Sequence, residues 1–158
     1  MKLLTSLWTP LIVFTASLGA MAQQDGVTWE LLDIINTLRA ADVEPLLCFN
    51  AKLTAASQQL ANEMALTGVL STTTLDGSSP TERAVAQGLN TTGVSELVGA
   101  GYENASHAVA EWLRTPAYRA YFLSNDMFVG IGYAYNAAQT YKSFWVVDFA
   151  NATNETCS

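Results

Sequence analysis

Few side chains in this sequence could do chemistry. The chain of 158 residues has one histidine, His107, and two cysteines, Cys48 and Cys157. A tight zinc site takes three or four ligands drawn mainly from histidine and cysteine, so the sequence predicts no metal centre and no cofactor. Catalysis by a histidine needs a nucleophile and an orienting acid beside it, and no such pattern accompanies His107. A surface position on a helix is the simpler interpretation of this residue, and no catalytic residue is predicted.

The charge balance excludes a further class of partner. Lysine and arginine number 7, aspartate and glutamate number 14, and the formal net charge is -7. Because a nucleic-acid-binding surface neutralises phosphates with basic side chains, we expect no nucleic acid partner. Half of the residues are hydrophobic and 13% are charged, which is typical of an ordinary globular domain.

Residues 1–22 have the organisation of an export signal. Lys2 precedes the apolar stretch Leu11–Phe14, and Ala20–Ala22 has the small-x-small spacing that predicts cleavage before Gln23. The apolar run is interrupted by polar residues and proline and falls short of the roughly 20 residues that span a bilayer, which disfavours an anchor. We therefore expect a secreted, extracellular monomer that does not span a membrane and whose mature part, 23–158, is one domain.

Export would also determine the state of the cysteines and of four asparagines. An even number of cysteines in an oxidising compartment favours a Cys48–Cys157 disulfide, with two buried free thiols as the alternative. Such a bridge closes a loop of about a hundred residues and contributes ~4 to 5 kcal/mol in the chain-entropy model. In a eukaryotic host the asparagines of four Asn-x-Ser/Thr triplets would be glycosylated: Asn90, Asn104, Asn151 and Asn154. The last two lie close together in sequence, and one sugar is expected on that pair.

Four segments have the apolar spacing of amphipathic helices. The first is 28–39, and the second is 50–67, which has Asn50 as a candidate cap and Gly68 as a stop. The capping box Ser79–Glu82 begins a third helix that extends to Gln87, and 106–114 is the fourth. The expected buried face of the first helix consists of Trp29, Leu32, Ile35 and Leu38.

Three later segments are short and apolar. Residues 95–101 are bounded by glycine and fit a strand or an irregular buried segment, whereas 128–135 and 144–149 fit an antiparallel pair of strands. Gly130 and Gly132 lie inside a strand that no helix follows, so they indicate close packing of a helix rather than a phosphate-binding loop. Helices first and strands last predict an α+β domain in which helices cover a small antiparallel sheet.

Several short motifs follow one another in a characteristic order: Leu31–Asn36 with Arg39-Ala40, Glu44–Leu46, Lys52–Ala56, Met64-Ala65, Asp76–Pro80 with Arg83-Ala84, Ala108–Leu113, Arg119 with Phe122-Leu123, Ile131–Tyr135 and Trp145–Ala150. Their order and spacing resemble the CAP superfamily, the cysteine-rich secretory, antigen 5 and pathogenesis-related proteins that share the SCP domain. The resemblance covers nearly the whole mature chain and implies an α-β-α sandwich. It is strongest to short secreted members from microbial eukaryotes such as oomycetes.

The resemblance implies a cleft that holds two histidines and two acidic residues, which bind a divalent metal in some members. Here Thr72 takes the place of the first histidine, and Tyr118, within a turn at Thr115–Arg119, takes the place of the second. Glu96 keeps one acidic position, and Glu111 is the candidate for the other. The cleft is therefore expected to be degenerate, with Glu96 satisfied by a donor such as Tyr118 or Thr72.

Two functions follow from these expectations. One is a secreted non-catalytic module that binds a sterol or fatty acid, as the resemblance implies. The other is an effector that recognises a host or cell-wall protein through the loops 72–76 and 136–142. A hydrolase with Tyr118 and Glu96 as an acid/base pair is a third alternative. The aromatic residues that could line a ligand groove, unless they belong to the core, are Tyr118, Tyr121, Phe122, Tyr133, Tyr135 and Tyr141.

Overall fold

The computed structural model describes the backbone of residues 17–158 and the side chains of residues 26–158. Most of the predicted export signal lies outside these residues, and the cleavage position before Gln23 falls within the first helix. The elements follow in the order α1 (Ser17–Ala41), β1 (Cys48–Phe49), α2 (Ala51–Thr67), α3 (Pro80–Ala86), β2 (Ser95–Ala100), α4 (Ala105–Leu113), α5 (Pro116–Phe122), β3 (Phe128–Tyr135) and β4 (Ser143–Ala150).

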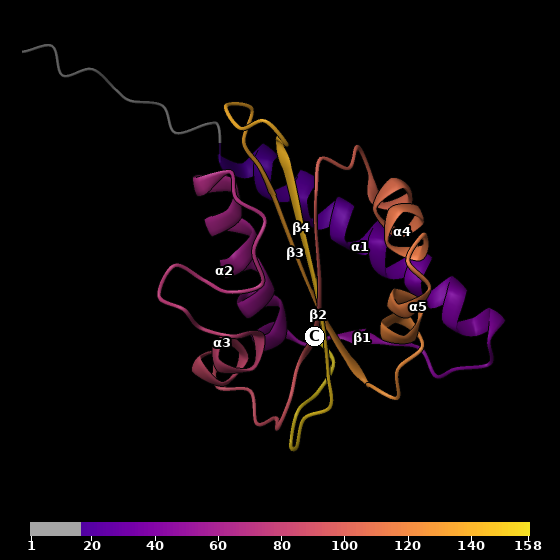
Figure 1. Cartoon of the computed structure of the whole chain (residues 1–158). Helices are drawn as coiled ribbons and strands as arrows, with labels where there is room; N and C mark the ends of the chain where they lie inside the picture. Colours follow the sequence, from indigo (N-terminus) through magenta and orange to yellow (C-terminus); the bar gives the residue numbers. More distant parts are fainter. Residues whose placement is uncertain (1–16) are drawn as a thin grey trace, which may run out of the picture.

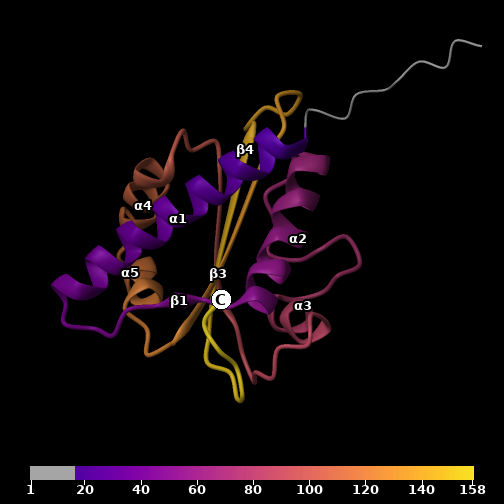
Figure 2. The same cartoon turned by 180° about the vertical axis from the view of Figure 1, so that it is seen from behind.

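The strands form one sheet between two layers of helices (Figure 1). α2 and α3 cover one face of the sheet, and α1, α4 and α5 cover the other, as the view from behind also shows (Figure 2). This arrangement confirms the α+β class and the α-β-α sandwich expected from the sequence.

The sheet is mixed, because one parallel strand joins the expected antiparallel ones. The strand order is β1-β3-β4-β2. β3 pairs with β4 from Phe128↔Ala150 to Tyr135↔Ser143, and β2 lies antiparallel on the other side of β4. The parallel strand is β1, which places Cys48 opposite Phe128. A strand of two residues has no alternating pattern, so periodicity could not predict it.

The predicted caps of two helices are present. Asn50 accepts a hydrogen bond from the N–H of Leu53 at 3.1 Å, and Gly68 ends α2 with a φ of 74°. The capping box of Ser79 and Glu82 begins α3. Asn104 caps α4, which therefore starts one residue earlier than the apolar spacing indicates.

Two expectations about the layer of α1, α4 and α5 are wrong. Thr115–Arg119 is not a turn, because the helix α5 begins at Pro116, a residue suited to the first helical position, and buries Phe122. Trp29 does not belong to the buried face of α1. It is 58% exposed, and its ring meets that of Phe49 edge-on with a centroid distance of 4.8 Å. The buried residues of this face are Leu31, Leu32 and Ile35.

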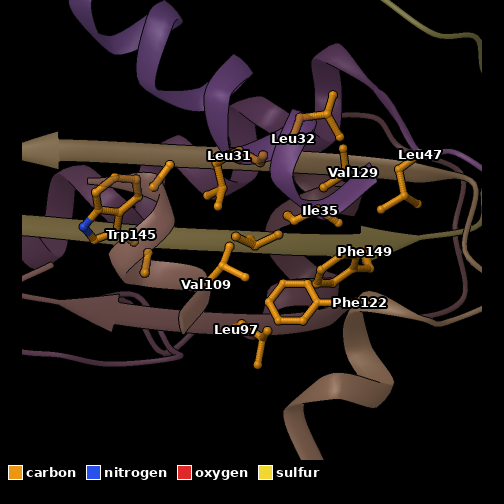
Figure 3. Close-up of a cluster of buried hydrophobic side chains, with 14 of the residues drawn as sticks. Leu31, Leu32, Ile35, Leu47, Leu97, Val109, Phe122, Val129, Trp145 and Phe149 are labelled. Carbon is orange, nitrogen blue, oxygen red and sulfur yellow. The ribbon is translucent and has the colours of Figure 1, made fainter. Parts of the chain in front are cut away.

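The largest apolar cluster fills the space between the sheet and this same layer of helices (Figure 3). Val109 of α4 and Phe122 of α5 pack there against Leu97, Val129 and Phe149 of the strands. Burial of apolar surface on this scale is the main stabilising contribution to a domain of this size.

A buried arginine joins the end of α1 to the segment that precedes β3. Arg39, in the last turn of α1, is fully buried. Its guanidinium donates to four backbone carbonyls, with N···O distances between 2.7 and 3.4 Å: those of Pro45, Phe122, Ser124 and Asp126. Burial lowers the pKa of Arg39 from its usual value, opposed by the charges of Glu44 and Asp126.

On the opposite face, two glycines let α2 approach the sheet closely. A Cβ atom on Gly130 would lie 2.4 Å from the carbonyl carbon of Leu53, and one on Gly132 would lie 2.3 Å from the carbonyl oxygen of Ser57. The backbone of α2 thus occupies the space where side chains would be. The prediction that this glycine pair serves helix packing is confirmed.

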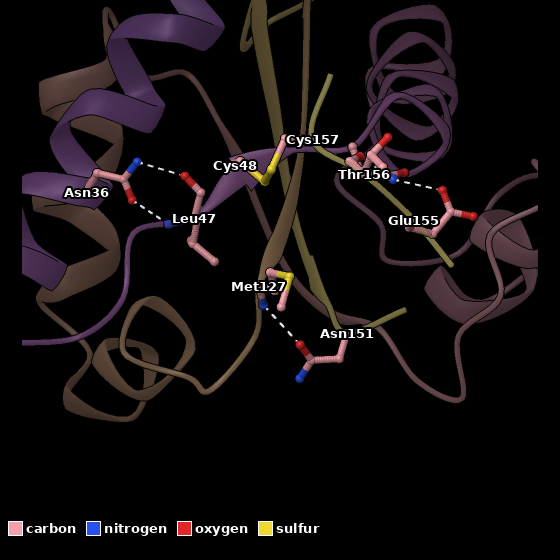
Figure 4. Close-up of a disulfide and its surroundings, with 9 residues drawn as sticks. Asn36, Leu47, Cys48, Met127, Asn151, Glu155, Thr156 and Cys157 are labelled. Carbon is pink, nitrogen blue, oxygen red and sulfur yellow. Dashed lines mark hydrogen bonds between the residues drawn. A yellow bond between two sulfur atoms is a disulfide. The ribbon is translucent and has the colours of Figure 1, made fainter. Parts of the chain in front are cut away.

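The disulfide joins β1 to the C-terminal segment (Figure 4). Cys48 and Cys157 are bonded, so the expected bridge is confirmed and the chain has no free thiol. Glu155 fixes the same segment to the start of α2, because it accepts from Lys52 at 2.6 Å and from the amide of Asn50 at 3.1 Å. Within the described residues, no helix is long and apolar enough to cross a membrane.

Candidate functional site

A row of polar residues crosses the face of the sheet that α2 covers. Glu96 of β2 pairs in register with Asp148 of β4, which pairs in turn with Gly130 of β3. The hydroxyl of Ser57 on α2 donates to Asp148 Oδ2 at 2.7 Å. The close approach that Gly130 permits is therefore also what brings this serine to the carboxylate.

Arg83 of α3 completes the row. Its Nη2 donates to Glu96 Oε2, and its Nη1 donates to the carbonyl oxygens of Thr72 and Ser78, each at 3.1 Å. One guanidinium thereby joins the carboxyl pair to the middle and to the C-terminal end of the loop between α2 and α3. We call Arg83, Glu96, Asp148 and Ser57 the buried charge cluster.

Burial raises the pKa of both carboxyls in this cluster. The pKa of Glu96 rises to about 9, mainly by desolvation and then by the charge of Asp148, while Arg83 opposes the shift. Desolvation also raises the pKa of Asp148, against the hydrogen bonds from Ser57 and Glu96. Because two adjacent buried carboxylates repel each other, the pair retains a proton at neutral pH and balances the charge of Arg83.

The buried charge cluster is closed to solvent. The side chains of Arg83 and Glu96 are 0% and 3% exposed, and Asp148 is fully buried. Arg83 Nε has no hydrogen-bond partner among the described residues. This geometry can hold a proton and fix the loop between α2 and α3. A change of charge in the cluster reduces the free energy of unfolding.

The four positions aligned with the family's cleft form two separate pairs. Thr72 lies near Glu96, linked to it through Arg83. Glu111 of α4 and Tyr118 of α5 lie in the opposite layer of helices. There, burial first and then their two charges raise the pKa of Tyr102.

The expected donor to Glu96 is wrong. We expected Tyr118 or Thr72, but the carboxylate accepts from Arg83, and the group of Thr72 that takes part is its backbone carbonyl. Tyr118 is 38% exposed, and its ring packs edge-on against Tyr121. A buried carboxylate is stabilised better by a charged, multiply hydrogen-bonding guanidinium than by a hydroxyl.

The residues at the family's metal positions do not fit a metal ion. Among the described residues, no group of three or more histidine, cysteine, aspartate or glutamate side chains could hold one. Glu96 is paired with Arg83, and Glu111 accepts from Arg114 at 3.0 Å. The lone histidine, His107, is 41% exposed on α4, with its Nε2 3.9 Å from Glu111. It therefore lies on the surface, as expected.

Arg83 and Asp148 are the important residues that motif reasoning missed. A signal for each is present in the sequence. Asp148 stands inside the apolar run Trp145–Ala150, where a charge must find a partner. Arg83 follows the capping box directly and precedes the buried Ala84, so its side chain begins on the inner face of a short helix.

An open cleft lies beside the charge cluster, between the second half of α2 and the loop that follows it. Its volume is ≈ 300 Å³. Leu60 and Met64 form a buried apolar floor, and Val69 and Leu75 form exposed apolar walls. Glu63, which also lines the cleft, accepts a hydrogen bond from the N–H of Leu75 at 2.7 Å and so holds the loop against α2. The remaining lining residues carry hydroxyls: Thr67, Ser71, Thr73 and Thr74.

The aromatic residues proposed as groove lining do not line this cleft. Phe122 is buried in the core, and Tyr133 packs against Trp145 with a centroid distance of 4.6 Å. Tyr135 and Tyr141 are 61% and 50% exposed near the ends of the β3–β4 hairpin. Some of these aromatic residues therefore belong to the core, as the alternative interpretation expected. The others lie on separate surfaces, because strand and helix periodicity directs their side chains differently.

The four sequon asparagines are all exposed, but their amides differ in their hydrogen bonds. The amide of Asn151 donates to the carbonyl of Asn125 at 3.1 Å and accepts from the N–H of Met127 (Figure 4). Asn104 uses its amide oxygen as the cap of α4. The backbone of Asn154 is left-handed, with a φ of 59°.

The α-β-α sandwich, the disulfide and the order of motifs define an SCP-type domain. The chain belongs to the CAP family, described as the cysteine-rich secretory protein family, whose model matches residues 32–149. No curated protein matches the chain.

Solved structures show the same fold. The chain is similar to an extracellular protein with an SCP domain from Bacillus anthracis, at 18% identity and a TM-score of 0.73, over 91% of this chain and 45% of that one. It is also similar to an outer surface protein of Borrelia burgdorferi, at 19% identity and a TM-score of 0.71, over 81% of this chain and 94% of that one. A cysteine-rich secretory protein of Staphylococcus aureus matches at 15% identity and a TM-score of 0.61, over 81% of this chain and 39% of that one. The chain thus spans less than half of two of these three proteins.

Proposed function

We propose that this protein is a secreted, non-catalytic binding module and that its ligand is a sterol-like molecule held in the cleft beside α2. The observation that carries the proposal is the cleft itself, which combines an apolar floor and walls with several hydroxyls. Small-molecule sites are typically concave, mostly apolar and equipped with a few polar groups that orient the ligand. At ≈ 300 Å³ the cleft would hold part of a sterol and leave the rest at its open side.

The charges around the cleft favour a neutral alcohol over a fatty acid. Glu63 lines the cleft, and Asp76 follows its wall residue Leu75. Hydrogen bonds from Thr74 and Ser78 lower the pKa of Asp76 to about 2, so this carboxylate is ionised at neutral pH. No lysine or arginine occurs between residues 59 and 79. A carboxylate ligand would meet like charge without a counterion, whereas a hydroxyl could hydrogen-bond to Thr67 or Ser71.

The absence of catalysis is supported by the position of the acidic residues. Glu96 and Asp148, the carboxyls with raised pKa, lie in the closed charge cluster and not in the cleft. Glu63, the acid that does line the cleft, holds the loop through Leu75. Catalysis requires a titratable group within hydrogen-bond distance of the substrate, and the cleft offers no pair of groups in that role.

Export of this module is supported by the predicted signal at 1–22, the disulfide and the extracellular or surface relatives. If the host is a eukaryote, we expect a sugar on Asn154 in preference to Asn151. The amide nitrogen of Asn151 already donates to Asn125, and a glycan there would replace one of its hydrogens.

The test is sterol binding by the secreted protein, with the sterol supplied from cyclodextrin and the complex detected by native mass spectrometry. Thr67→Trp places a large ring in the cleft and should weaken sterol binding by about tenfold or more. Val85→Trp, on an exposed part of α3, is the matched control and should bind like the wild type. Failure of the wild type to retain any sterol, or equal loss in both variants, would refute the proposal.

A second candidate function is recognition of a host or cell-wall protein through two loops. It is favoured by the way 136–142 packs on the end of α2: Asn136 donates to the carbonyl of Ala65 at 2.8 Å and Gln139 to that of Leu66 at 2.9 Å. This contact places 136–142 beside the start of the loop that contains 72–76. Exchange of 136–142, which does not line the cleft, should abolish capture of a protein partner while sterol binding is unchanged.

A further inference from the structure

Four exposed aliphatic side chains lie on the last turn of α2 and the loop after it, and two of them, Val69 and Leu75, line the cleft. Leu66 is 71% exposed, Val69 60%, Leu70 47% and Leu75 73%. We call these four residues the apolar rim. They occur within ten residues of sequence, at the end of α2 and in the loop after it (Figure 1). Isolated exposed leucines need no explanation, but four exposed aliphatic residues within ten positions, two of them at a cleft, indicate an interaction surface.

We propose that the apolar rim docks on the surface of a neutral phospholipid bilayer. The side chains in the rim are the first argument. Protein interfaces are enriched in tyrosine, tryptophan, methionine and arginine, and the rim contains only leucine and valine. Aliphatic side chains that project with exposures of 47–73% are suited to insertion between lipids, which needs no matching partner shape.

The charge around the rim determines the kind of bilayer. No basic residue occurs between 59 and 79, and the nearby carboxylates are Glu63 and Asp76. Asp76 remains ionised because hydrogen bonds lower its pKa to about 2. An anionic membrane would therefore repel this surface, whereas a zwitterionic one would not. Binding should depend on apolar burial and respond little to salt.

The ligand gives a reason for this docking, and this step rests on the proposed function. A sterol is almost insoluble in water, so it must reach the cleft from a lipid phase. Val69 and Leu75 belong both to the cleft wall and to the rim. Docking through the rim would place the open side of the cleft against the lipids, and the ligand would cross without exposure to water.

The experiment is flotation of the secreted protein with phosphatidylcholine vesicles that contain no sterol. The wild type should float with the vesicles, equally at low and high salt. The double variant Leu66→Asp, Leu70→Asp should associate about tenfold less or weaker still, because each change replaces an inserting side chain with a charge. Neither residue lines the cleft, so binding of sterol from cyclodextrin should stay at the wild-type level.

The matched control is Val43→Asp, Leu46→Asp, which removes two aliphatic side chains that are 91% and 61% exposed in the loop after α1. This variant should float like the wild type. A gain-of-binding variant, Leu70→Trp, should associate more strongly, because tryptophan favours the lipid–water interface. Circular dichroism establishes that each variant is folded.

Several results would overturn the proposal. They are no flotation of the wild type, equal loss in the two aspartate pairs, or flotation that requires anionic lipid. Sedimentation that shows a dimer which the Leu66→Asp, Leu70→Asp pair dissociates would assign the rim to a second copy of the chain. Sterol binding from cyclodextrin reports separately on the cleft, so failure of the bilayer proposal and failure of the proposed function can be distinguished.

Discussion

The two buried arginines of the described residues, Arg39 and Arg83, lie on opposite sides of the sheet and are held in different ways. Arg39, beside the large apolar cluster, donates only to backbone carbonyls. Arg83 donates to two carbonyls and to Glu96, which shares its burial with Asp148. A guanidinium held by carbonyl dipoles is fixed at any ordinary pH. One held by a carboxyl pair depends on how many protons the pair retains.

This difference distinguishes a side of the molecule whose stability should not depend on pH from a side whose stability should. The side of α1, α4 and α5 combines Arg39 with one continuous apolar cluster. On the side of α2 and α3 the apolar residues fall into two smaller clusters, and Glu96 and Asp148 extend from the sheet toward the same helices. The cleft and its loop are attached to this second side through Arg83. The cleft, where we expect a ligand to bind, therefore lies on the side of the sheet that contains the titratable carboxyl pair.

The largest expected effect is on the side of Arg39. Arg39→Met removes the donor from four backbone carbonyls, one buried and three partly buried, and should reduce the free energy of unfolding by about 4 kcal/mol. Urea unfolding at about pH 5.5 and about pH 8.5 should give the same loss, because no carboxyl hydrogen-bonds to this guanidinium. Arg114→Met, on a side chain that is 75% exposed, is the control and should change little. A pH-dependent loss in Arg39→Met would contradict the comparison.

The corresponding change on the other side, Arg83→Met, should cost about 3 kcal/mol at alkaline pH. The cost should be smaller at acid pH, because a fully protonated carboxyl pair no longer needs a counterion. The same urea series measures both values. If the loss is equal at the two pH values, Glu96 and Asp148 do not share a proton in the way we describe.

The approach of α2 to the sheet can be tested at Gly132. Gly132→Ala places a Cβ atom 2.3 Å from the carbonyl oxygen of Ser57, so the helix must shift, and we expect a loss of about 2 kcal/mol. Gly93→Ala, where nothing lies within 4 Å of the added atom, should be neutral. Thermal unfolding of the two variants side by side decides the point, and a neutral Gly132→Ala would show that the contact is not tight.

The smallest expected effect is a slope in the pH dependence of stability. Glu96 has a folded pKa raised from 4.5 to about 9, so the folded state binds more protons than the unfolded state between these values. Stability from this group is complete below about pH 4.5 and is lost as the pH rises toward 9. Glu96→Gln, whose amide does not titrate, should flatten this decline across the window.

The control for that slope is Glu155→Gln. Hydrogen bonds from Lys52 and Asn50 lower the pKa of Glu155, so its contribution is lost only as the pH falls below about 4.5. The variant should therefore leave the slope above that pH unchanged. An unchanged slope in Glu96→Gln would place the responsible proton on another group.

The sequence by itself determined the elements whose signals are local. Asn50, Gly68 and the Ser79–Glu82 box identify helix ends, because caps act through hydrogen bonds only a few residues away. Alternation in 128–135 and 144–149 identifies the antiparallel pair, and the glycines within it identify the close helix. The order of motifs was enough to place the chain in its family.

Tertiary structure alone decided which of the chain's few charged residues matter. Arg39 contacts carbonyls more than eighty residues away, and Arg83 meets Glu96 only because α3 folds onto the edge of the sheet. Tyr118 and Thr72 have the right places in the motif order but lie in different layers, since sequence order does not fix which face of a sheet a helix covers. The cleft likewise forms where one face of α2 lies against the loop that follows it, and no local sequence pattern predicts that contact.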